Sequence, residues 1–305
     1  MGKRVAIGLD IGGSKIAGGL IEQNSGCVVL RKVIPTLPER GGGAVLEDSL
    51  VLTGRLIAEA QIQNRSIIGI GIGICELVDQ NGNITDNYLL HWKDLPVRKR
   101  FAQLAPTVIE SDVRAPALAE ALYGAGKPYN LFAYVTVGTG ISYALVQDGQ
   151  PMKGARGKAI VLGSSSLRVH CPHCGEMVSQ VLEEFASGPA MVTRYNERSK
   201  SQLATGQELM AAVDAGDEVA IEVVHSAGQA LGNSVGFMSN LLDPEAIIIG
   251  GGVGLAGGPY WEHFVAATRR NIYATDTRSL PILPAKLGVD AGLIGAGAIA
   301  MQAFR

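Results

Sequence analysis

Short apolar runs separated by glycine-rich turns dominate the beginning of the chain. Residues 5–7, 16–21 and 27–34 each carry enough apolar side chains to predict a strand. Apolar residues with helical spacing follow over 45–63. The run 67–74 is almost continuously apolar, which is typical of a buried strand in a parallel sheet. Three strands, a helix and a further strand together predict an α/β lobe.

The second half of the chain repeats this plan. Strands are predicted at 132–137 and 141–146, with a glycine-rich turn at 138–140 between them. Two hairpins of similar plan but different sequence predict an internal structural duplication. Polar helices are expected over 206–240, and the boundary between two lobes is expected near the helix predicted at 115–123.

Composition indicates a globular chain that is large enough for two cores. The 305 residues are 47% hydrophobic and 18% charged, and the formal net charge is -2. Because basic charge is neither dominant nor clustered, nucleic acid is not an expected partner. Glycine and charged residues interrupt each apolar stretch before it reaches membrane-spanning length. With no secretory signal pattern and no disulfide framework among the four cysteines, a cytoplasmic location is expected.

The stretch Gly8 to Lys15 joins the first two predicted strands and is the first candidate for chemistry. Glycines in a tight turn let backbone N–H groups approach a phosphate, while Ser14 adds a hydroxyl and Lys15 a cation. Asp10 ends the first strand, where a carboxylate can hold Mg²⁺ directly or through water. The alternative is a plain glycine-rich hairpin turn. This is not a Walker P-loop, because no Gly-Lys-Ser/Thr sequence opens a helix here.

A second glycine-rich strand end lies late in the chain. The buried strand predicted at 247–249 opens into Gly250, Gly251 and Gly252. Such a turn either packs closely against its neighbours or offers a flat backbone surface on which a purine can lie.

Six segments along the chain resemble, in the same order, the motifs of the ROK sugar kinases, which belong to the actin, hexokinase and Hsp70 superfamily. The similar segments are 10–15 (DIGGTK in the family), 69–79 (GIGIPGxVD), 110–120 (DNDANAAAxGE), 138–140 (second phosphate motif), 249–252 (adenosine strand) and 288–297 (LGDDAGLIGAA). The resemblance covers nearly the whole chain. It implies an α/β, ribonuclease H-like, actin-like ATPase fold with two lobes and a central ligand cleft.

This resemblance also implies the lobes and the activity. The N-terminal lobe would span 1–118 with 292–305, and the C-terminal lobe 119–291. The implied reaction is ATP- and Mg²⁺-dependent phosphorylation of a hydroxyl, the primary alcohol being the first choice, of a hexose-like substrate by a homodimer. The repressor branch of the family carries an N-terminal winged helix, and the early position of Asp10 leaves no room for one.

The resemblance assigns the binding residues as well. Besides Asp10 for Mg²⁺, the nucleotide would contact Gly12, Gly13, Ser14, Lys15, Gly138, Thr139, Gly140, Gly250, Gly251 and Gly252. The sugar-like substrate would contact Glu76, Asn87, Ser111, Asp112, Gly157, Val161, Ser164 and Glu183.

Asp112 is the predicted general base. It lies at a strand end just before a helix, and a carboxylate that reaches the attacking hydroxyl can orient it and accept its proton. Ser111 stands where the family has asparagine. The alternative for Asp112 is a helix N-cap.

Two sugar-contacting residues of the family are missing. The family reads GAxGxAGEIGH after the second hairpin, and here valine (Val161) replaces the glutamate and serine (Ser164) the histidine. Valine offers no hydrogen bond to a sugar hydroxyl.

The family's zinc motif is eroded too. Cys171 and Cys174 keep a CxxC pair, but a tetrahedral structural site needs four ligands and no third cysteine follows. The alternatives are a zinc site completed by His170 or His173, and a cysteine-bearing loop left from a lost site.

Acidic residues stand at two positions where the family differs. Glu76 replaces a glycine and Glu110 an aspartate, while Glu183 keeps a sugar-binding glutamate of the family. If Glu76 and Glu183 both face the ligand cleft, the extra negative charge would suit an amino group, and the acceptor would be an amino sugar or a cyclitol in place of a neutral hexose. The alternative is a solvated Glu76.

Three functions therefore compete. Retention of Asp10, Asp112 and both glycine turns favours an ATP-dependent sugar kinase, and the missing glutamate and histidine favour a sensor that binds sugar or nucleotide without catalysis. Regulation through DNA binding is disfavoured by the near-neutral charge and the early Asp10.

Overall fold

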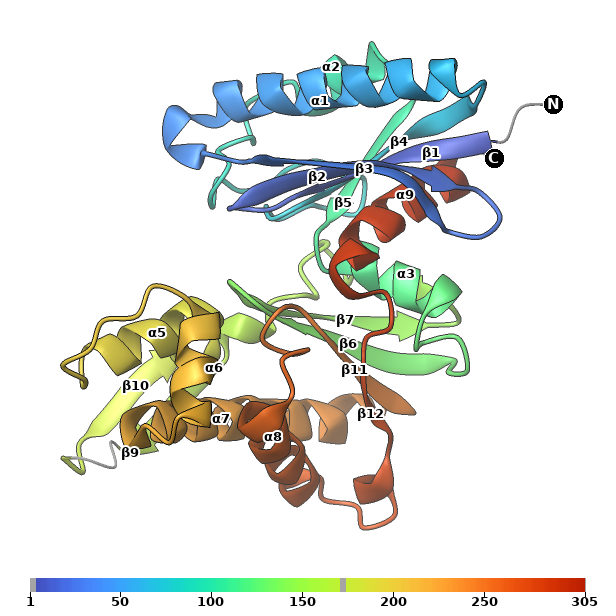
Figure 1. Cartoon of the computed structure of the whole chain (residues 1–305). Helices are drawn as coiled ribbons and strands as arrows, with labels where there is room; N and C mark the ends of the chain where they lie inside the picture. Colours follow the sequence, from blue (N-terminus) through green and yellow to red (C-terminus); the bar gives the residue numbers. More distant parts are fainter. Residues whose placement is uncertain (1–3, 171–173, 305) are drawn as a thin grey trace. The chain divides into compact units, whose positions relative to one another are not determined.

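The computed structural model of the chain describes residues 4–170 and 174–304. The chain forms two compact units. The first contains Met1–Asn130, Ala144–Ile160 and Lys286–Arg305, and the second contains Leu131–Tyr143 and Val161–Ala285. Each unit combines a sheet with helices, as the sequence predicts (Figure 1).

The first unit contains the predicted hairpin, helix and parallel strands. Its elements are β1 (Arg4–Ile11), β2 (Lys15–Glu22), β3 (Val28–Pro35), η1 (Pro38–Arg40), α1 (Gly42–Ile62), β4 (Ser66–Ile74), α2 (Val97–Ala102), β5 (Thr107–Ser111), α3 (Arg114–Tyr123), η4 (Gly288–Asp290) and α9 (Ala291–Ala303). The sheet has the order β3-β2-β1-β4-β5. Strands β1, β2 and β3 pair antiparallel, whereas β1, β4 and β5 pair parallel.

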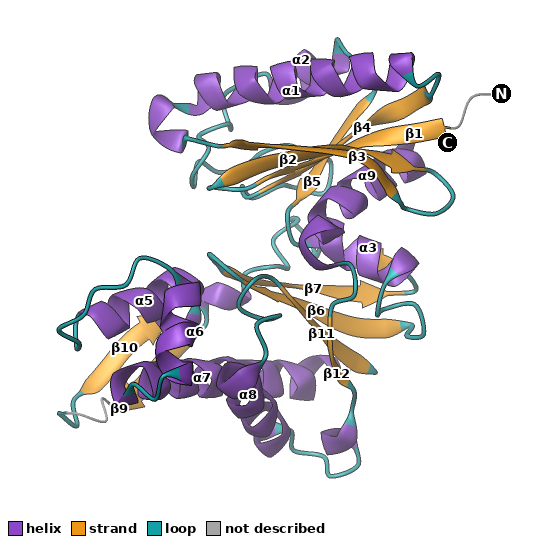
Figure 2. Cartoon of the chain, in the orientation of Figure 1, coloured by secondary structure: helices purple, strands orange, loops and turns teal. Residues whose placement is uncertain are grey.

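Helices cover both faces of this first sheet. Helix α1 lies along one face and α9 along the other (Figure 2). Small residues allow α9 to approach closely, because a Cβ at Gly8 of β1 or Gly71 of β4 would collide with the α9 backbone. A Cβ at Gly295 would likewise collide with the α3 backbone at Ala115. Helices α3 and α9 therefore pack together, and the first unit includes α3 together with the predicted segments 1–118 and 292–305.

The second unit is built around the second predicted hairpin. Its elements are β6 (Leu131–Val137), β7 (Ile141–Gln147), η2 (Leu162–Ser164), β9 (Ser166–His170), β10 (Met177–Val181), α4 (Leu182–Ala186), α5 (Gly188–Asn196), α6 (Gly206–Asp214), α7 (Glu218–Leu242), β11 (Ala246–Gly250), α8 (Gly258–Asn271), η3 (Thr277–Ser279) and β12 (Ile282–Pro284). Strand β7 runs on into the segment grouped with the first unit, which also holds β8 (Gln150–Pro151).

The order of the second sheet confirms the predicted duplication. It reads β12-β11-β6-β7-β8, so each sheet places its first strand between a hairpin neighbour and a later strand. That later strand, β4 or β11, pairs parallel with the first strand and with a final strand at the sheet edge. The two hairpins thus occupy equivalent positions in the two sheets.

Helix α7 differs from the polar helix that the sequence suggests. It buries apolar residues such as Val223, Val224 and Leu231 in the core of the second unit. It also packs tightly on α8, because a Cβ at Gly232 would collide with the backbone of α8 at Phe264. Over residues 4–170 and 174–304, every helix is too short or too polar to cross a membrane.

Candidate functional site

The carboxyl ends of three parallel strands bring acidic residues of the first unit together. Asp10 lies near the end of β1, Glu76 follows β4, and Asp112 follows β5. The strand register places Asp10 and Glu110 at the same level of the sheet, because both pair with Gly73 of β4. In α/β sheets this edge is where ligands usually bind.

Asp10 is fully buried, and its charge is only partly compensated within the protein. Burial raises the pKa of its carboxyl to about 6, although the positive charge of Lys15 acts in the opposite direction. A Cβ at Gly292 would lie 2.6 Å from Oδ2 of Asp10, so the carboxylate faces the first turn of α9. The positive end of the helix dipole favours a negative group at this position.

Asp112 is the second carboxylate with a raised pKa. Burial, followed by the negative charge of Asp10, raises its pKa to about 7, while the Ser111 hydroxyl and the Arg114 charge lower it. The Ser111 hydroxyl lies 3.5 Å from Oδ1 of Asp112, and Ser111 is fully buried. Ser111 therefore contacts the predicted base.

The alternative role of Asp112 as a helix N-cap is wrong. Helix α3 begins at Arg114, its N-cap residue is Val113, and no side chain accepts a capping hydrogen bond there. The Asp112 carboxylate is consequently not used to cap the start of the helix.

Two buried carboxylates, of which the charge of Asp10 raises the pKa of Asp112, fit a divalent cation nearby. Asp10 offers the carboxylate oxygens that Mg²⁺ prefers, and a cation bound there would also reduce the repulsion that the Asp112 carboxylate experiences.

Part of the predicted zinc site lies outside the residues that the structure describes. Cys171 and His173 lie outside the described residues, and the Cys174 thiol is free and exposed. Among the residues that the structure describes, no group of three or more His, Cys, Asp or Glu side chains could hold a metal ion.

The turn between β1 and β2, Gly12 to Lys15, is the first predicted phosphate turn, and the N–H of Gly12 closes it. This N–H donates to the carbonyl of Lys15 at 3.1 Å. The buried Thr36 supports the turn, since its hydroxyl donates to the Gly12 carbonyl at 2.6 Å and its N–H to the Ser14 carbonyl at 3.2 Å. The N–H groups of Gly13 and Ser14 have no partner in the described part of the chain. Gly12 is thus a turn-closing residue, and Gly13 and Ser14 keep the free donors.

The second turn follows the same rule in the second unit. The N–H of Gly138 donates to the Gly140 carbonyl at 2.9 Å. The N–H groups of Thr139 and Gly140 have no partner among residues 4–170 and 174–304. In each hairpin, the N–H of the first turn glycine closes the turn, and the next two N–H groups are free to bind a ligand.

The glycines at the end of β11, Gly250 to Gly252, differ in what a side chain would meet at each position. A Cβ at Gly250 would collide with the Tyr134 hydroxyl, and Gly251 has a φ of 81° with no space beside the Val137 carbonyl. A Cβ at Gly252 would meet nothing within 4 Å. Close packing thus explains Gly250 and Gly251, and only Gly252 keeps an open surface.

Glu76 is neither solvated nor free to bind a substrate amino group. Its side chain is 2% exposed, so the predicted alternative of a solvated acid is wrong. Backbone N–H groups of Tyr88, Leu89, Leu90 and His91 donate to its two oxygens at 2.5 to 3.1 Å. The carboxylate is satisfied within the protein.

Glu110 is also neutralised internally. It is 6% exposed, and Arg114, which is 1% exposed, places Nη2 at 2.6 Å from its Oε1. Lys153 lies 2.9 Å from its other oxygen. Arg114 further donates to the Gly157 carbonyl at 2.8 Å. Sequence reasoning missed Arg114, because Glu110 lies on β5 and Arg114 opens α3, so no helical spacing marks the pair.

The remaining substrate candidates lie apart in the chain. The Asn87 side chain accepts a hydrogen bond from the Lys93 N–H at 3.0 Å, and Gly157 packs against the Val78 carbonyl. In the second unit, Glu183 accepts from the Ile141 N–H at 2.7 Å.

Val161 and Ser164, at the positions of the missing sugar contacts, are exposed. A Cβ at Gly163, between them, would lie 3.0 Å from Oε2 of Glu183. Glu183 therefore joins the second phosphate turn to the segment that carries Val161 and Ser164.

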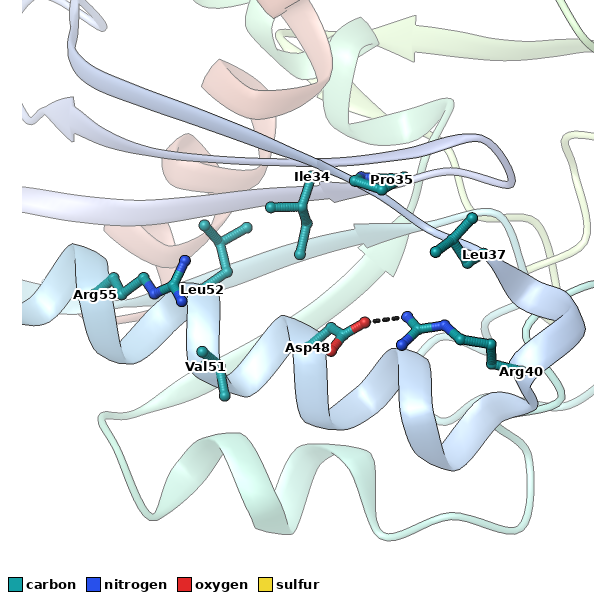
Figure 3. A pocket seen from close by; sticks show the side chains of 8 residues that line it. All are labelled: Ile34, Pro35, Leu37, Arg40, Asp48, Val51, Leu52 and Arg55. Carbon is teal, nitrogen blue, oxygen red and sulfur yellow. Dashed lines mark hydrogen bonds and ion pairs between the residues drawn. The ribbon is translucent and has the colours of Figure 1, made fainter.

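A cavity of about 240 Å³ lies between β3 and α1 (Figure 3). Its lining consists of Ile34, Pro35, Leu37, Arg40, Asp48, Val51, Leu52 and Arg55. Arg40 and Asp48 form an ion pair there, and none of the predicted site residues lines it. The cavity is therefore separate from the acidic strand ends.

Comparison with known proteins relates the whole chain to a single family. The sequence profile of the ROK family matches residues 6–303. A glucokinase of Halalkalibacterium halodurans is 28% identical over 99% of this chain and 96% of its own length.

Solved structures agree with the sequence comparison. A ROK hexokinase from Thermus thermophilus has 31% identity and a TM-score of 0.78 over 98% of both chains. A ROK family glucokinase from Streptomyces griseus, in complex with glucose and AMPPNP, has 26% identity and a TM-score of 0.80 over 98% of this chain and 99% of that one. These similarities confirm the predicted actin-like ATPase fold.

The similarity extends to regulators. The xylose repressor of Bacillus subtilis is 22% identical over 98% of this chain and 77% of the repressor. The homologues therefore include sugar kinases and repressors.

Proposed function

Because the chain belongs to the ROK family, we propose that it is an ATP-dependent kinase of a hexose-like sugar, with Asp112 as the general base. The observation that carries this proposal is the environment of the Asp112 carboxylate. Its carboxyl is desolvated, lies beside Asp10 and does not cap the following helix. A carboxylate in this state is available to accept a proton from a substrate hydroxyl.

The raised pKa suits this role at neutral pH. With a pKa of about 7, Asp112 is ionised in a large fraction of molecules near pH 7 and is more basic than an ordinary aspartate. It would orient the attacking hydroxyl and take up its proton as the bond to phosphorus forms. The primary alcohol of the sugar is the proposed acceptor.

Binding of the phosphates would rest on the open backbone donors. Gly13 and Ser14 in the first unit and Thr139 and Gly140 in the second each keep an N–H without a partner in the described structure. Such donors suit phosphate oxygens. Asp10, with Asp112 nearby, would hold Mg²⁺, which when bound neutralises charge on the phosphates of ATP.

The satisfied acids favour a neutral acceptor. The hypothesis of an amino sugar depends on excess negative charge, but Glu76 is occupied by backbone amides and Glu110 by Arg114 and Lys153. Glu183 in turn accepts from a backbone N–H. We therefore propose a neutral hexose or cyclitol in place of an amino sugar.

An ATP-consumption assay over hexoses, N-acetylated and amino sugars, and cyclitols tests this function. We expect turnover with a neutral hexose-like compound, and a loss of about 10²–10⁴-fold in kcat for Asp112→Asn with sugar affinity retained. Turnover that survives Asp112→Asn unchanged would exclude the proposed base. Light scattering of the same sample tests the proposed homodimer.

A sensor without catalysis is the second candidate. Val161 and Ser164 leave the usual glutamate and histidine contacts unfilled, and a repressor stands among the relatives. Sugar binding by calorimetry without phosphorylation of any compound in the assay would favour this function.

A further inference from the structure

The turn from Tyr88 to His91 is held by one buried carboxylate. Its four successive backbone N–H groups all donate to Glu76, three of them to Oε1 and that of Tyr88 to Oε2. His91 has a φ of 55°, a left-handed conformation that is unusual for a residue with a side chain. The turn therefore depends on Glu76 for the partners of its amides.

The same turn is anchored in the core on its other side. Leu90 and Trp92 are fully buried, and the Trp92 indole N–H donates to the Gly42 carbonyl at 2.9 Å. Glu76 and this anchor together fix the position of Leu89, which lies between Tyr88 and Leu90.

Leu89 contacts the first phosphate turn. A Cβ at Gly13 would collide with Cδ2 of Leu89, so the leucine methyl occupies the space that a side chain at this position would need. Thr36 bonds to the Gly12 and Ser14 carbonyls of the same turn. The phosphate turn is thus held by Thr36 through hydrogen bonds and by Leu89 through packing.

We propose that Glu76 is a positioning residue for nucleotide binding, which acts through the Tyr88–His91 turn and Leu89 on Gly13. The proposal rests on the proposed function insofar as the phosphate turn binds ATP. It gives Glu76 a role on the phosphate side of the site, in contrast to the substrate contact that the sequence suggests.

The geometry ranks the replacements of Glu76. Alanine removes both acceptor oxygens and with them all four hydrogen bonds. Glutamine keeps one oxygen for the three amides of Leu89, Leu90 and His91 but turns an NH₂ group toward the Tyr88 N–H. We expect Glu76→Ala to have a larger effect than Glu76→Gln.

Hydrogen exchange tests the coupling without requiring any ligand. In Glu76→Ala the amides of residues 88–91 should lose protection, and so should the N–H groups of Gly12 and Thr36, whose hydrogen bonds define the phosphate turn. Amides of β11 in the second unit should not change. Loss of protection at 88–91 with Gly12 and Thr36 unchanged overturns the proposal, whether or not the chain is a kinase.

Binding of AMPPNP with Mg²⁺ tests the consequence. We expect the Kd to rise about tenfold in Glu76→Ala and less in Glu76→Gln, since misplacement of a binding group by a fraction of an ångström has effects of this order. Leu89→Ala keeps the Glu76 hydrogen bonds and removes the methyl contact, so it should weaken binding as well. Glu39→Gln removes an exposed glutamate elsewhere in the first unit and is the control that should leave the Kd unchanged.

The outcomes separate the two proposals. Wild-type protein that fails to bind AMPPNP contradicts the proposed function, and the exchange data still decide on the coupling. Wild-type protein that binds AMPPNP while Leu89→Ala and Glu76→Gln bind equally well contradicts the role of Glu76. If Glu76→Ala does not fold, these two variants carry the test.

Discussion

Four carboxylates lie at the ends of β1, β4 and β5, and they fall into two pairs. Glu76 and Glu110 are buried and have partners within the protein, namely backbone amides for the first and Arg114 with Lys153 for the second. For Asp10 and Asp112 burial outweighs the compensation from Lys15 and from Ser111 with Arg114, and their pKa values are raised. The difference separates acids that hold the structure from acids that are available for chemistry.

The number of acidic residues near a site therefore does not give the net charge that a ligand meets there. From the sequence, Glu76 and Glu110 look like additional negative charge beside the acceptor. In the structure each of them is matched by donors from the same unit. A satisfied carboxylate stabilises its surroundings, whereas an unsatisfied one retains a free-energy cost that a cation or a proton can relieve.

The largest expected effect is the loss of stability in Glu110→Gln. This change leaves the buried Arg114 guanidinium without its carboxylate, and breaking a buried ion pair in this way costs about 3–5 kcal/mol. Denaturant unfolding measures the loss. Arg114→Gln should cost less, because Glu110 keeps Lys153 at 2.9 Å, and the double variant should recover part of the loss. Equal losses of stability for the two single variants would contradict this interpretation, in which Arg114 depends on Glu110 more than Glu110 depends on Arg114.

The next effect is a fall in kcat/KM at low pH. Asp112 must be ionised to act as a base, and its pKa is raised to about 7, so kcat/KM should fall about tenfold per unit as the pH decreases below that value. Because Asp10 titrates nearby with a pKa of about 6, the observed steps belong to the pair. The pH–rate profile of the phosphorylation measures this, and a base with an ordinary aspartate pKa would instead give a flat profile down to about pH 5.

The next effect is a small gain in stability in Asp112→Asn, opposite in sign to the loss expected for Glu110→Gln. A raised pKa in the folded state means that the carboxyl favours folding below its unfolded pKa of 3.8 and that this contribution is lost as the pH rises through about 7. Removing the charge should therefore raise the Tm by a few degrees at pH 8 in metal-free buffer, and by less at pH 5. Thermal unfolding of both proteins at the two pH values measures the difference, and a lower Tm at pH 8 would refute the cost assigned to Asp112.

The sequence predicts much of this arrangement because local patterns encode it. Apolar runs locate β1, β2, β4 and β6, and the glycine turns mark the ends where the acids gather. The partners of those acids are not local. The amides of the Tyr88–His91 turn reach Glu76 across more than ten residues, and Lys153 reaches Glu110 across more than forty. No periodicity in the sequence encodes such contacts. The hydrophobic pattern also does not predict helix α8, which begins with a glycine and a proline.

The smallest expected effect concerns Cys75, which lies among the same acids. Burial, and then the negative charges of Asp112 and Glu76, raise the pKa of its thiol, so little thiolate exists at pH 8. Iodoacetamide should therefore label Cys75 at least about tenfold more slowly than the exposed Cys27, as followed by peptide mass spectrometry. Asp112→Asn removes the first of these charges and should speed the labelling of Cys75 while leaving that of Cys27 unchanged. Faster labelling at both cysteines would instead indicate general loosening of the fold, and an unchanged rate at Cys75 would mean that burial alone protects the thiol and that the Asp112 charge does not reach it.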